Sequence, residues 1–263
     1  CIMKYFYDLK YDKDIISSIN YMFYFHGYLD NIQSLKNKIT NKQISFCEYT
    51  DKPTKFKNSY YGILDNKKVV KNSYQFKKHH IITGPNAAGK TTLLKSTLFN
   101  IILSQQIGCG FYDKANINMY HYIHCYLNIP DTSGRDSLFQ AEARRCKEIL
   151  DKINKVPNKR HFCIFDELYS GTNPTDAVDS AYSFLSYLTK FKNINFILTT
   201  HYVDLCEKLS TNKKIENKNI KIIKENNDIT YTYKLTKGIC KIKGGNKILK
   251  DLGYPEEIVS NNT

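Results

Sequence analysis

The sequence predicts an α/β fold, in which a mixed sheet is flanked by helices, and three observations carry this prediction. From residue 84 to residue 201, apolar runs of strand length alternate with segments of helical periodicity. A Gly-containing turn lies between one strand-like run and the helix-like segment after it. Two further strand-like runs end in titratable side chains, at the edge where open α/β sheets bind ligands.

The composition excludes several classes of protein. The chain has 263 residues, 41% of them hydrophobic, which is too apolar for a disordered chain. Its apolar runs, such as residues 194–200, are shorter than the ~18–20 residues of a membrane helix, and its start does not resemble a signal peptide. No two of the eight cysteines form a C-x-x-C pair. We therefore expect reduced thiols in an intracellular protein, cytoplasmic or nuclear, with no membrane partner.

Residues 1–50 have apolar positions at helical spacing on both sides of Gly27. This spacing predicts two short helices that meet near Gly27. The first residue is Cys1 rather than Met, so we expect the chain to be cut from a longer one. A change of pattern near residue 50 suggests a domain boundary between residues 1–50 and residues 51–263.

The segments on either side of the alternating region also show recognisable patterns. Residues 51–83 predict short strands and loops. Residues 220–235 contain two β-rich runs around a polar turn, which predicts a hairpin. The last segment, residues 244–259, predicts a short helix after Gly245 and another that begins at Pro255.

Residues 84–91 read Gly-Pro-Asn-Ala-Ala-Gly-Lys-Thr and fit the pattern G-x-x-x-x-G-K-[ST]. Such a loop turns its backbone N–H groups toward phosphates, and the helix N-terminus behind it adds donors. In this pattern Lys90 reaches the β- and γ-phosphates and the Thr91 hydroxyl binds Mg²⁺. The sequence thus predicts a site for ATP and Mg²⁺ formed by Gly84, Pro85, Asn86, Ala87, Ala88, Gly89, Lys90, Thr91 and Thr92.

Two later strands supply candidate catalytic groups. The run 160–165 ends in Asp166 and Glu167. We expect Asp166 to bind Mg²⁺ and Glu167 to act as the general base on water. Because successive side chains of a strand face opposite ways, the two can act together only if the strand ends there. The run 195–200 ends at His201, which we expect to contact the γ-phosphate or the attacking water.

Several motifs in this order resemble those of the MutS family of DNA mismatch-repair ATPases, over roughly residues 60–259. The matching segments are Val69–Asn72, Thr83–Thr92, Ser133–Glu142, Asp166–Pro174, Thr199–Tyr202 and Gly238–Pro255. The resemblance implies a P-loop NTPase fold of the ABC type for residues 51–263. It also implies that residues 1–50 are the helical end of the core and lever region, joined to this ATPase domain.

The resemblance further implies how such a chain works. Family members are dimers that hold ATP between facing subunits, either as homodimers or as related heterodimers. Ser137 matches the serine that contacts the nucleotide of the partner in trans, Glu142 shapes the same composite site, and Asn72 lies near the base. The implied function is an ATP-hydrolysing motor of a mismatch-repair or recombination protein, modulated by double-stranded DNA that is contacted mainly outside this chain.

The sequence departs from the family pattern at the loop and before Ser137. Ala87 and Ala88 stand where the commoner form has Met-Gly, so a positive φ at Ala88 would cost energy. Asp136 is an extra residue in the Ser-Gly-x-Ser element, and no mismatch-reading domain is present.

Three alternatives stay open at this stage. One is another ABC-type genome-maintenance ATPase, although the Leu-Ser-Gly-Gly signature that it requires is absent. Another is a nucleotide-gated module that does not hydrolyse ATP, which the presence of Lys90, Asp166, Glu167 and His201 disfavours. The third is direct DNA binding through the net charge of +14, part of which reads as the lysine bias of an AT-rich genome. The pair His79 and His80 is interpreted as structural.

Overall fold

The structure is a computed structural model that divides into two compact units, Cys1–Ser45 and Phe46–Thr263. The described residues are 2–64, 69–127, 129, 137–225, 228–242, 249–250, 252–255 and 257–258. The element Ser133–Asp136 and most of the predicted C-terminal helices in residues 244–259 lie outside them.

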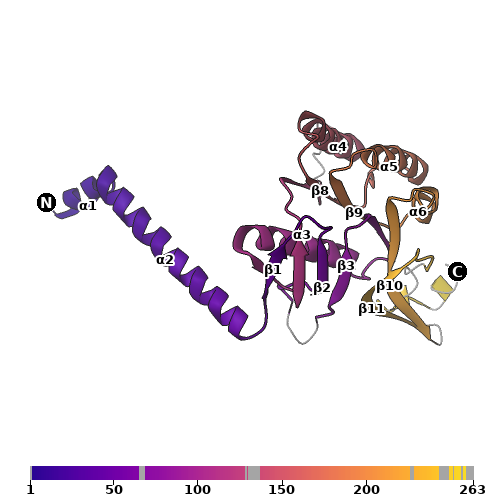
Figure 1. Cartoon of the computed structure of the whole chain (residues 1–263), viewed down its shortest axis with the longest axis horizontal. Helices are drawn as coiled ribbons and strands as arrows, with labels where there is room; N and C mark the ends of the chain where they lie inside the picture. Colours follow the sequence, from indigo (N-terminus) through magenta and orange to yellow (C-terminus); the bar gives the residue numbers. More distant parts are fainter. Residues whose placement is uncertain are drawn as a thin grey trace. The chain divides into compact units, whose positions relative to one another are not determined.

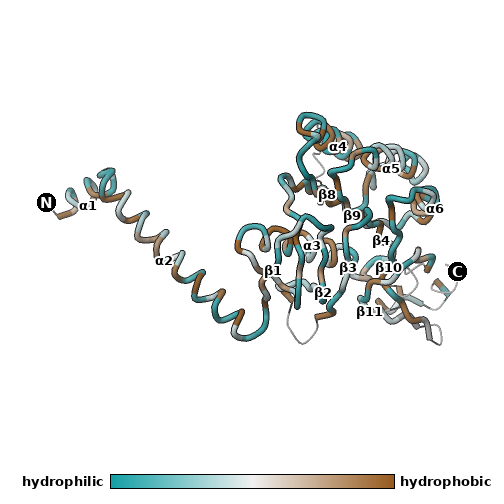
Figure 2. The backbone as a smooth tube through the Cα atoms, viewed as in Figure 1, coloured by the Kyte–Doolittle hydropathy of each residue, from teal (hydrophilic) through white to brown (hydrophobic). Residues whose placement is uncertain are grey.

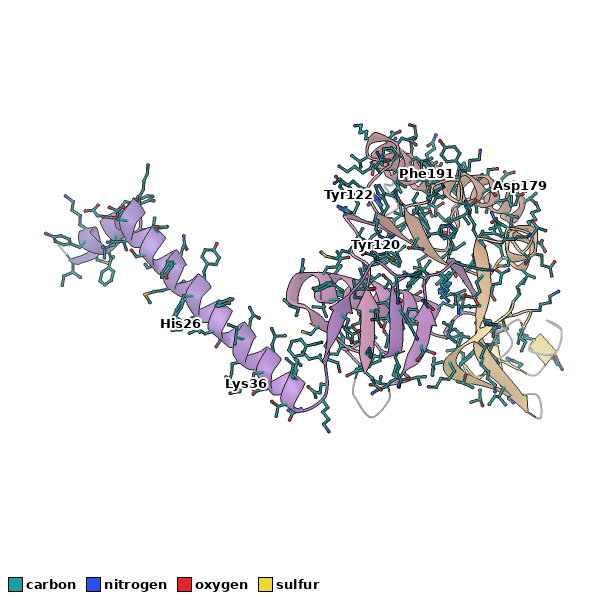
Figure 3. The ribbon with its side chains drawn as sticks, viewed as in Figure 1. His26, Lys36, Tyr120, Tyr122, Asp179 and Phe191 are labelled. Atoms are coloured by element: carbon teal, nitrogen blue, oxygen red, sulfur yellow. The ribbon has the colours of Figure 1, made fainter. Side chains whose placement is uncertain are left out.

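The first unit consists of the helices α1 (Ile2–Leu9) and α2 (Lys13–Thr40). Asp12 caps α2, because its carboxylate accepts hydrogen bonds from the backbone N–H groups of the first turn. The predicted break at Gly27 is wrong, since α2 continues through it. One interior glycine costs a helix only about 1 kcal/mol. No residue of α1 or α2 is buried, and side chains project from α2 all around the helix (Figure 3). Apolar residues recur along the whole of α2 (Figure 2).

The second unit contains a six-stranded sheet in the order β11-β10-β4-β9-β8-β7. Its strands are β4 (His79–Thr83), β7 (Tyr122–Tyr126), β8 (His161–Asp166), β9 (Ile194–Thr200), β10 (Ile215–Glu225) and β11 (Asp228–Lys237). Every neighbouring pair is parallel except β10 and β11, which form the predicted hairpin. The carboxyl ends of the five parallel strands therefore share one edge of the sheet, which we call the carboxyl edge. The opposite edge, where these strands begin, is the amino edge.

A smaller five-stranded sheet has the order β3-β2-β6-β1-β5. Its strands are β1 (Ser45–Tyr49), β2 (Lys55–Ser59), β3 (Asn72–Gln75), β5 (Cys109–Gly110) and β6 (Lys114–Ile117). The helix α3 (Lys90–Ile107) packs against strands of both sheets. Because β1 pairs with β6, the chain enters the larger unit shortly before residue 50. The lever-region assignment for residues 1–50 stays a prediction.

The helices α4 (Leu138–Lys155), α5 (Pro174–Leu188) and α6 (Val203–Leu209) lie together beside β8 and β9 (Figure 1). Alternate side chains of β8 belong to two different cores. Phe162 and Ile164 pack in the core that contains α3, whereas Cys163 and Phe165 pack in the core that contains α4, α5 and α6. The sheet is thus covered on both faces, which confirms the α/β prediction. Within the described residues, every helix is too short or too polar to cross a membrane.

Candidate nucleotide site

The predicted phosphate loop connects β4 to α3 at the carboxyl edge. Two of its residues have left-handed backbone, Ala87 with φ 65° and Gly89 with φ 89°. The positive φ that would be costly at Ala88 falls instead on Ala87, one residue earlier. Ala88 is instead buried, and its N–H donates to the Pro85 carbonyl at 3.3 Å.

Lys90 is the first residue of α3, and only 6% of its surface is exposed. Its ammonium donates to the carbonyls of Gly84 (2.9 Å) and Pro85 (3.2 Å) and lies 3.7 Å from Glu167 Oε1. Burial lowers the pKa of Lys90, and the nearby carboxylates oppose this shift. The loop therefore surrounds a buried cation with weak oxygen partners that an anionic phosphate can replace.

Asp166 is the last residue of β8 and faces the start of α3. Its carboxylate accepts hydrogen bonds from Thr91 Oγ1, at 3.0 Å to Oδ2, and from the Thr199 hydroxyl. The register between β8 and β9 sets Asp166 opposite Thr199. Carboxylate and hydroxyl oxygens are the ligands that Mg²⁺ prefers, so this pair fits the predicted metal ligands.

Glu167 follows the end of β8 in left-handed conformation, with φ 51°. The strand thus ends between Asp166 and Glu167, as is required for the two carboxylates to act together. Glu167 Oε1 lies 3.4 Å from His201 Nδ1, which comes directly after β9. The hydrogen bond from His201 holds the pKa of Glu167 below its usual value, against the effect of burial. Glu167 is therefore a carboxylate at neutral pH and able to accept a proton.

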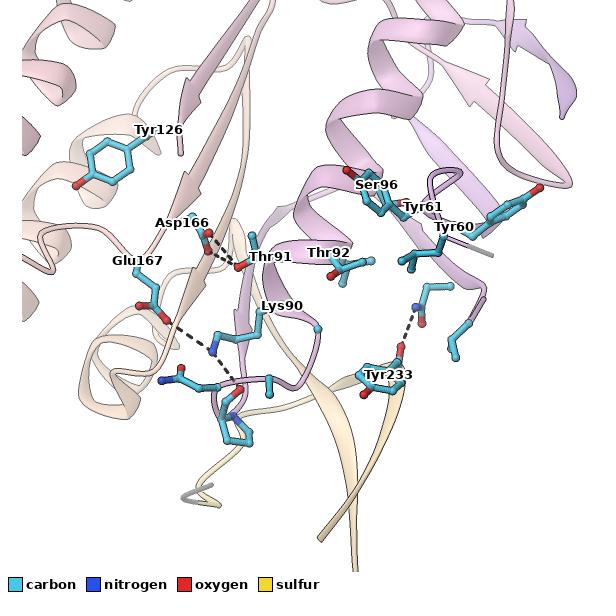
Figure 4. Close-up of a pocket in the computed structure, with 18 of the residues that line it drawn as sticks. Tyr60, Tyr61, Lys90, Thr91, Thr92, Ser96, Tyr126, Asp166, Glu167 and Tyr233 are labelled. Atoms are coloured by element: carbon cyan, nitrogen blue, oxygen red, sulfur yellow. Dashed lines mark hydrogen bonds and ion pairs between the residues drawn. The ribbon is translucent and has the colours of Figure 1, made fainter. Parts of the chain in front are cut away.

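Lys90, Thr91, Asp166 and Glu167 line one cavity of about 850 Å³, a volume typical of small-molecule sites, whereas His201 lines a separate hollow. Figure 4 shows Lys90, Asp166 and Glu167 on one side of it and Tyr60, Tyr61 and Tyr233 on the other. Aromatic side chains offer flat apolar faces on which a planar ring system can stack. The cavity therefore combines a charged end with an aromatic end.

Tyr233 belongs to this site although the sequence analysis did not identify it. Ile220 pairs with Leu235, but Ile222 pairs with Tyr231, so β11 bulges between these pairs. Tyr233 has φ 55° within the bulge. Its ring lies so near Gly89 that a Cβ there would be 2.9 Å from Tyr233 Cδ1. Alternation in sequence predicts a strand but not a bulge that turns one side chain toward the loop.

Asn72 also borders the cavity, in β3. Its amide donates to the Tyr233 carbonyl (3.0 Å) and accepts from the Leu235 N–H (2.7 Å). These two bonds join the small sheet to β11 and hold the backbone around Tyr233 in place. The expected contact of Asn72 with a base stays a prediction.

The two residues expected to act across a dimer differ in their surroundings. Ser137 is exposed and caps α4, where its Oγ accepts from the Gln140 N–H at 3.3 Å. Glu142 is buried, and its carboxylate accepts from Ser170 N–H (3.1 Å) and Gly171 N–H (3.1 Å) of its own chain. Glu142 thus holds the loop that follows Asp166 and Glu167. The roles of Ser137 and Glu142 in trans stay predictions.

Comparison with known proteins agrees with this geometry. The sequence model of the family MutS domain V matches residues 80–263. The chain is 29% identical to "Endonuclease MutS2" of Finegoldia magna over 97% of its own length and 32% of that protein. It is 32% identical to "DNA mismatch repair protein MutS" of Parabacteroides distasonis over 68% of its length and 20% of that protein. A MutS protein of Petrotoga mobilis is 27% identical over 94% of the chain and 32% of that protein.

The chain therefore spans about a third or less of the length of these relatives. The family match begins at His80 in β4, immediately before the phosphate loop, and includes β8 and β9. It covers well over half of the chain, so on sequence and geometry together the chain belongs to the MutS family and carries its ATPase domain, domain V.

Proposed function

We propose that this chain is the ATP-hydrolysing motor of a MutS-like DNA mismatch-repair or recombination protein. The observation that carries the proposal is the meeting of Lys90, the Thr91–Asp166 pair and Glu167 at one cavity, with His201 in contact with Glu167. Two of the relatives named above are DNA mismatch-repair proteins, which supports this biological setting. In that setting the partner is DNA and the location is the cytoplasm or the nucleus.

The chemistry follows from the positions of these groups. Lys90 exchanges its loop carbonyls for phosphate oxygens and neutralises part of their charge. Thr91 and Asp166 are the residues that would hold Mg²⁺, which supplies further charge neutralisation when bound. Glu167 accepts a proton from the attacking water, and His201 orients Glu167 by its contact with Oε1.

The composite dimer site is the finer part of this proposal. Ser137 is exposed at the N-terminus of α4, where N–H groups and the helix dipole favour a negative ligand. We expect this end to meet the γ-phosphate bound to a second copy or to a related subunit. Closure of such a dimer then depends on ATP, because the γ-phosphate joins the two subunits.

The substitution Glu167→Gln tests hydrolysis, with Glu148→Gln as the control on the exposed face of α4. We expect E167Q to reduce ATP turnover at least 100-fold, because glutamine has the shape of glutamate but cannot act as a general base. ATP binding should persist. Sedimentation should show an ATP-dependent dimer that no longer dissociates, because the bound ATP is not hydrolysed. A wild-type chain that binds ATP without turnover at micromolar protein would favour the non-hydrolysing module instead.

A further inference from the structure

The amino edge, away from the nucleotide cavity, gathers lysines from four separate loops. These loops are residues 76–78, 156–160, 189–193 and 210–214, which precede β4, β8, β9 and β10. None of them contains Asp or Glu. Their exposed lysines, which we call the basic edge, are Lys77, Lys78, Lys159, Lys190, Lys192, Lys213 and Lys214.

Hydrogen bonds between neighbouring loops and strands hold the basic edge in a row. The Lys214 carbonyl accepts from the His79 N–H at 2.9 Å, and the Phe76 carbonyl accepts from Asn195 Nδ2 at 3.3 Å. Farther along, the Asn193 carbonyl accepts from the His161 N–H at 2.9 Å. The four strands lie in the order β10-β4-β9-β8, so at about 4.8 Å a strand the row spans roughly 15 Å.

Within the described part of the chain, no carboxylate neutralises the charges of the basic edge. Elsewhere lysines pair with carboxylates, as in Lys71–Asp113, Lys208–Asp179 and Lys241–Glu207. Among the described residues, no carboxylate lies within ion-pair distance of any lysine of the basic edge. Behind this row, burial lowers the pKa of His79 and His80, so both rings are neutral near pH 7 and the positive charge belongs to the lysines.

The chemistry of the four loops identifies the kind of partner. None of the exposed large apolar side chains lies in them, although a protein interface needs an apolar centre and a membrane surface needs an apolar wedge. Exposed aromatic rings for stacking on single-stranded bases are likewise missing from these fully described loops. Lysine ammonium groups act as point charges, which suit phosphates and do not read base sequence.

We propose that the basic edge is a second binding surface, which contacts the phosphate backbone of duplex DNA without sequence preference. This surface uses the ends of the strands opposite to the nucleotide cavity, and a five-residue strand such as β4 separates the two edges by roughly 16 Å. The proposal does not depend on ATP hydrolysis, because none of these lysines borders the cavity of the candidate nucleotide site.

The test replaces one lysine in each loop, in the variant K77Q/K159Q/K192Q/K213Q. The matched control, K52Q/K55Q/K57Q/K221Q, removes the same charge from exposed positions in β2, in the loop before it and in β10 of the hairpin. Binding of a fluorescent 30-base-pair DNA is followed by anisotropy across a salt series, with the full 263-residue chain and no nucleotide. Circular dichroism and thermal melting check that both variants fold.

For the wild type we expect log K to fall linearly with log salt. Each lost phosphate contact reduces the slope by about 0.9, so the basic-edge variant should lose about 2–4 of slope and bind at least 30-fold more weakly at 0.1 M salt. The control should keep most of the wild-type slope. Equal losses in both variants, or an unchanged slope in the basic-edge variant, overturn the proposal. Tighter binding to oligo-dT, to poly-glutamate or to anionic vesicles than to the duplex overturns it as well.

Discussion

The carboxyl edge and the amino edge of the six-stranded sheet differ in backbone conformation as well as in charge. Ala87, Gly89, Glu167 and Tyr169, all near the carboxyl edge, have positive φ, whereas no residue of the four amino-edge loops does. Left-handed backbone costs a non-glycine residue about 1–2 kcal/mol. The strain therefore lies where one ammonium and two carboxylates must meet at fixed distances. A surface of exposed lysines needs no such fixed geometry.

The largest expected effect comes from removing the cation of the carboxyl edge. We expect Lys90→Ala to lower ATP turnover at least 1000-fold, a loss of about 4 kcal/mol of transition-state stabilisation. The cause is that Lys90 is the buried ammonium held among the loop carbonyls beside Glu167. The measurement is steady-state phosphate release. Lys52→Ala, an exposed lysine outside the cavity, is the control and should turn over ATP like the wild type.

Buried histidines in the six-stranded sheet should make the protein less stable in mild acid. Burial lowers the pKa of His79 to about 4, of His80 to about 3 and of His124 to about 4. The unfolded chain, with histidine pKa values near 6.5, binds more protons between pH 6.5 and pH 4. The free energy of unfolding should therefore fall by roughly 1 kcal/mol for each histidine between pH 7.5 and pH 5.5. Urea unfolding at the two pH values measures this difference.

His80→Phe is the matched variant for this experiment. The His80 ring stacks on Phe76 at 4.8 Å, and neither of its nitrogens has a hydrogen-bond partner among the described residues. Glu216 lies 3.4 Å from Nε2, but the neutral ring forms no ion pair with it near pH 7. Phenylalanine should keep the stacking and remove about a third of the pH dependence. An unchanged pH dependence in H80F would show that His80 is not one of its sources.

The sequence predicted the carboxyl edge better than the rest of the cavity. Lys90, Asp166, Glu167 and His201 each stand at a strand end or helix start, which short patterns identify. Tyr233 could not be found in this way, because its position depends on a bulge in β11. That bulge is held by a hydrogen bond from the Leu235 N–H to Asn72, which lies more than 160 residues earlier in the chain.

Two points of local conformation show the limits of judging a single residue. Gly27 was expected to end a helix, yet its intrinsic preference is too weak to interrupt the 28 residues of α2. Ala88 stands where the commoner family form has glycine, which drew attention to a costly positive φ there, yet the loop turns at Ala87. In both cases the neighbouring residues determine the backbone conformation more strongly than the identity of one residue does.

A smaller effect is expected from Gly89→Ala in the phosphate loop. Alanine at φ 89° is strained, and its Cβ would lie 2.9 Å from the Tyr233 ring, so we expect a loss of about 2 kcal/mol in unfolding free energy. Gly238→Ala is the control, because φ there is 104° but the nearest atom lies 3.7 Å away. The double variant with Tyr233→Ala should recover only the part due to the clash. Full recovery would mean that the backbone at Gly89 is not strained.

The smallest effect is also the sharpest test of strain at the carboxyl edge. Glycine substitutions at the adjacent residues Ala87 and Ala88 should change the free energy of unfolding in opposite directions. Ala87→Gly relieves a left-handed alanine but makes the unfolded chain more flexible, so we expect a net gain of about 0.5 kcal/mol. Ala88→Gly relieves no strain and removes a buried methyl group, so we expect a loss of about 1 kcal/mol. Urea unfolding of both variants measures the difference. If both lose stability equally, Ala87 carries no strain, and the contrast in backbone strain between the two edges would rest on Glu167 and Tyr169 alone.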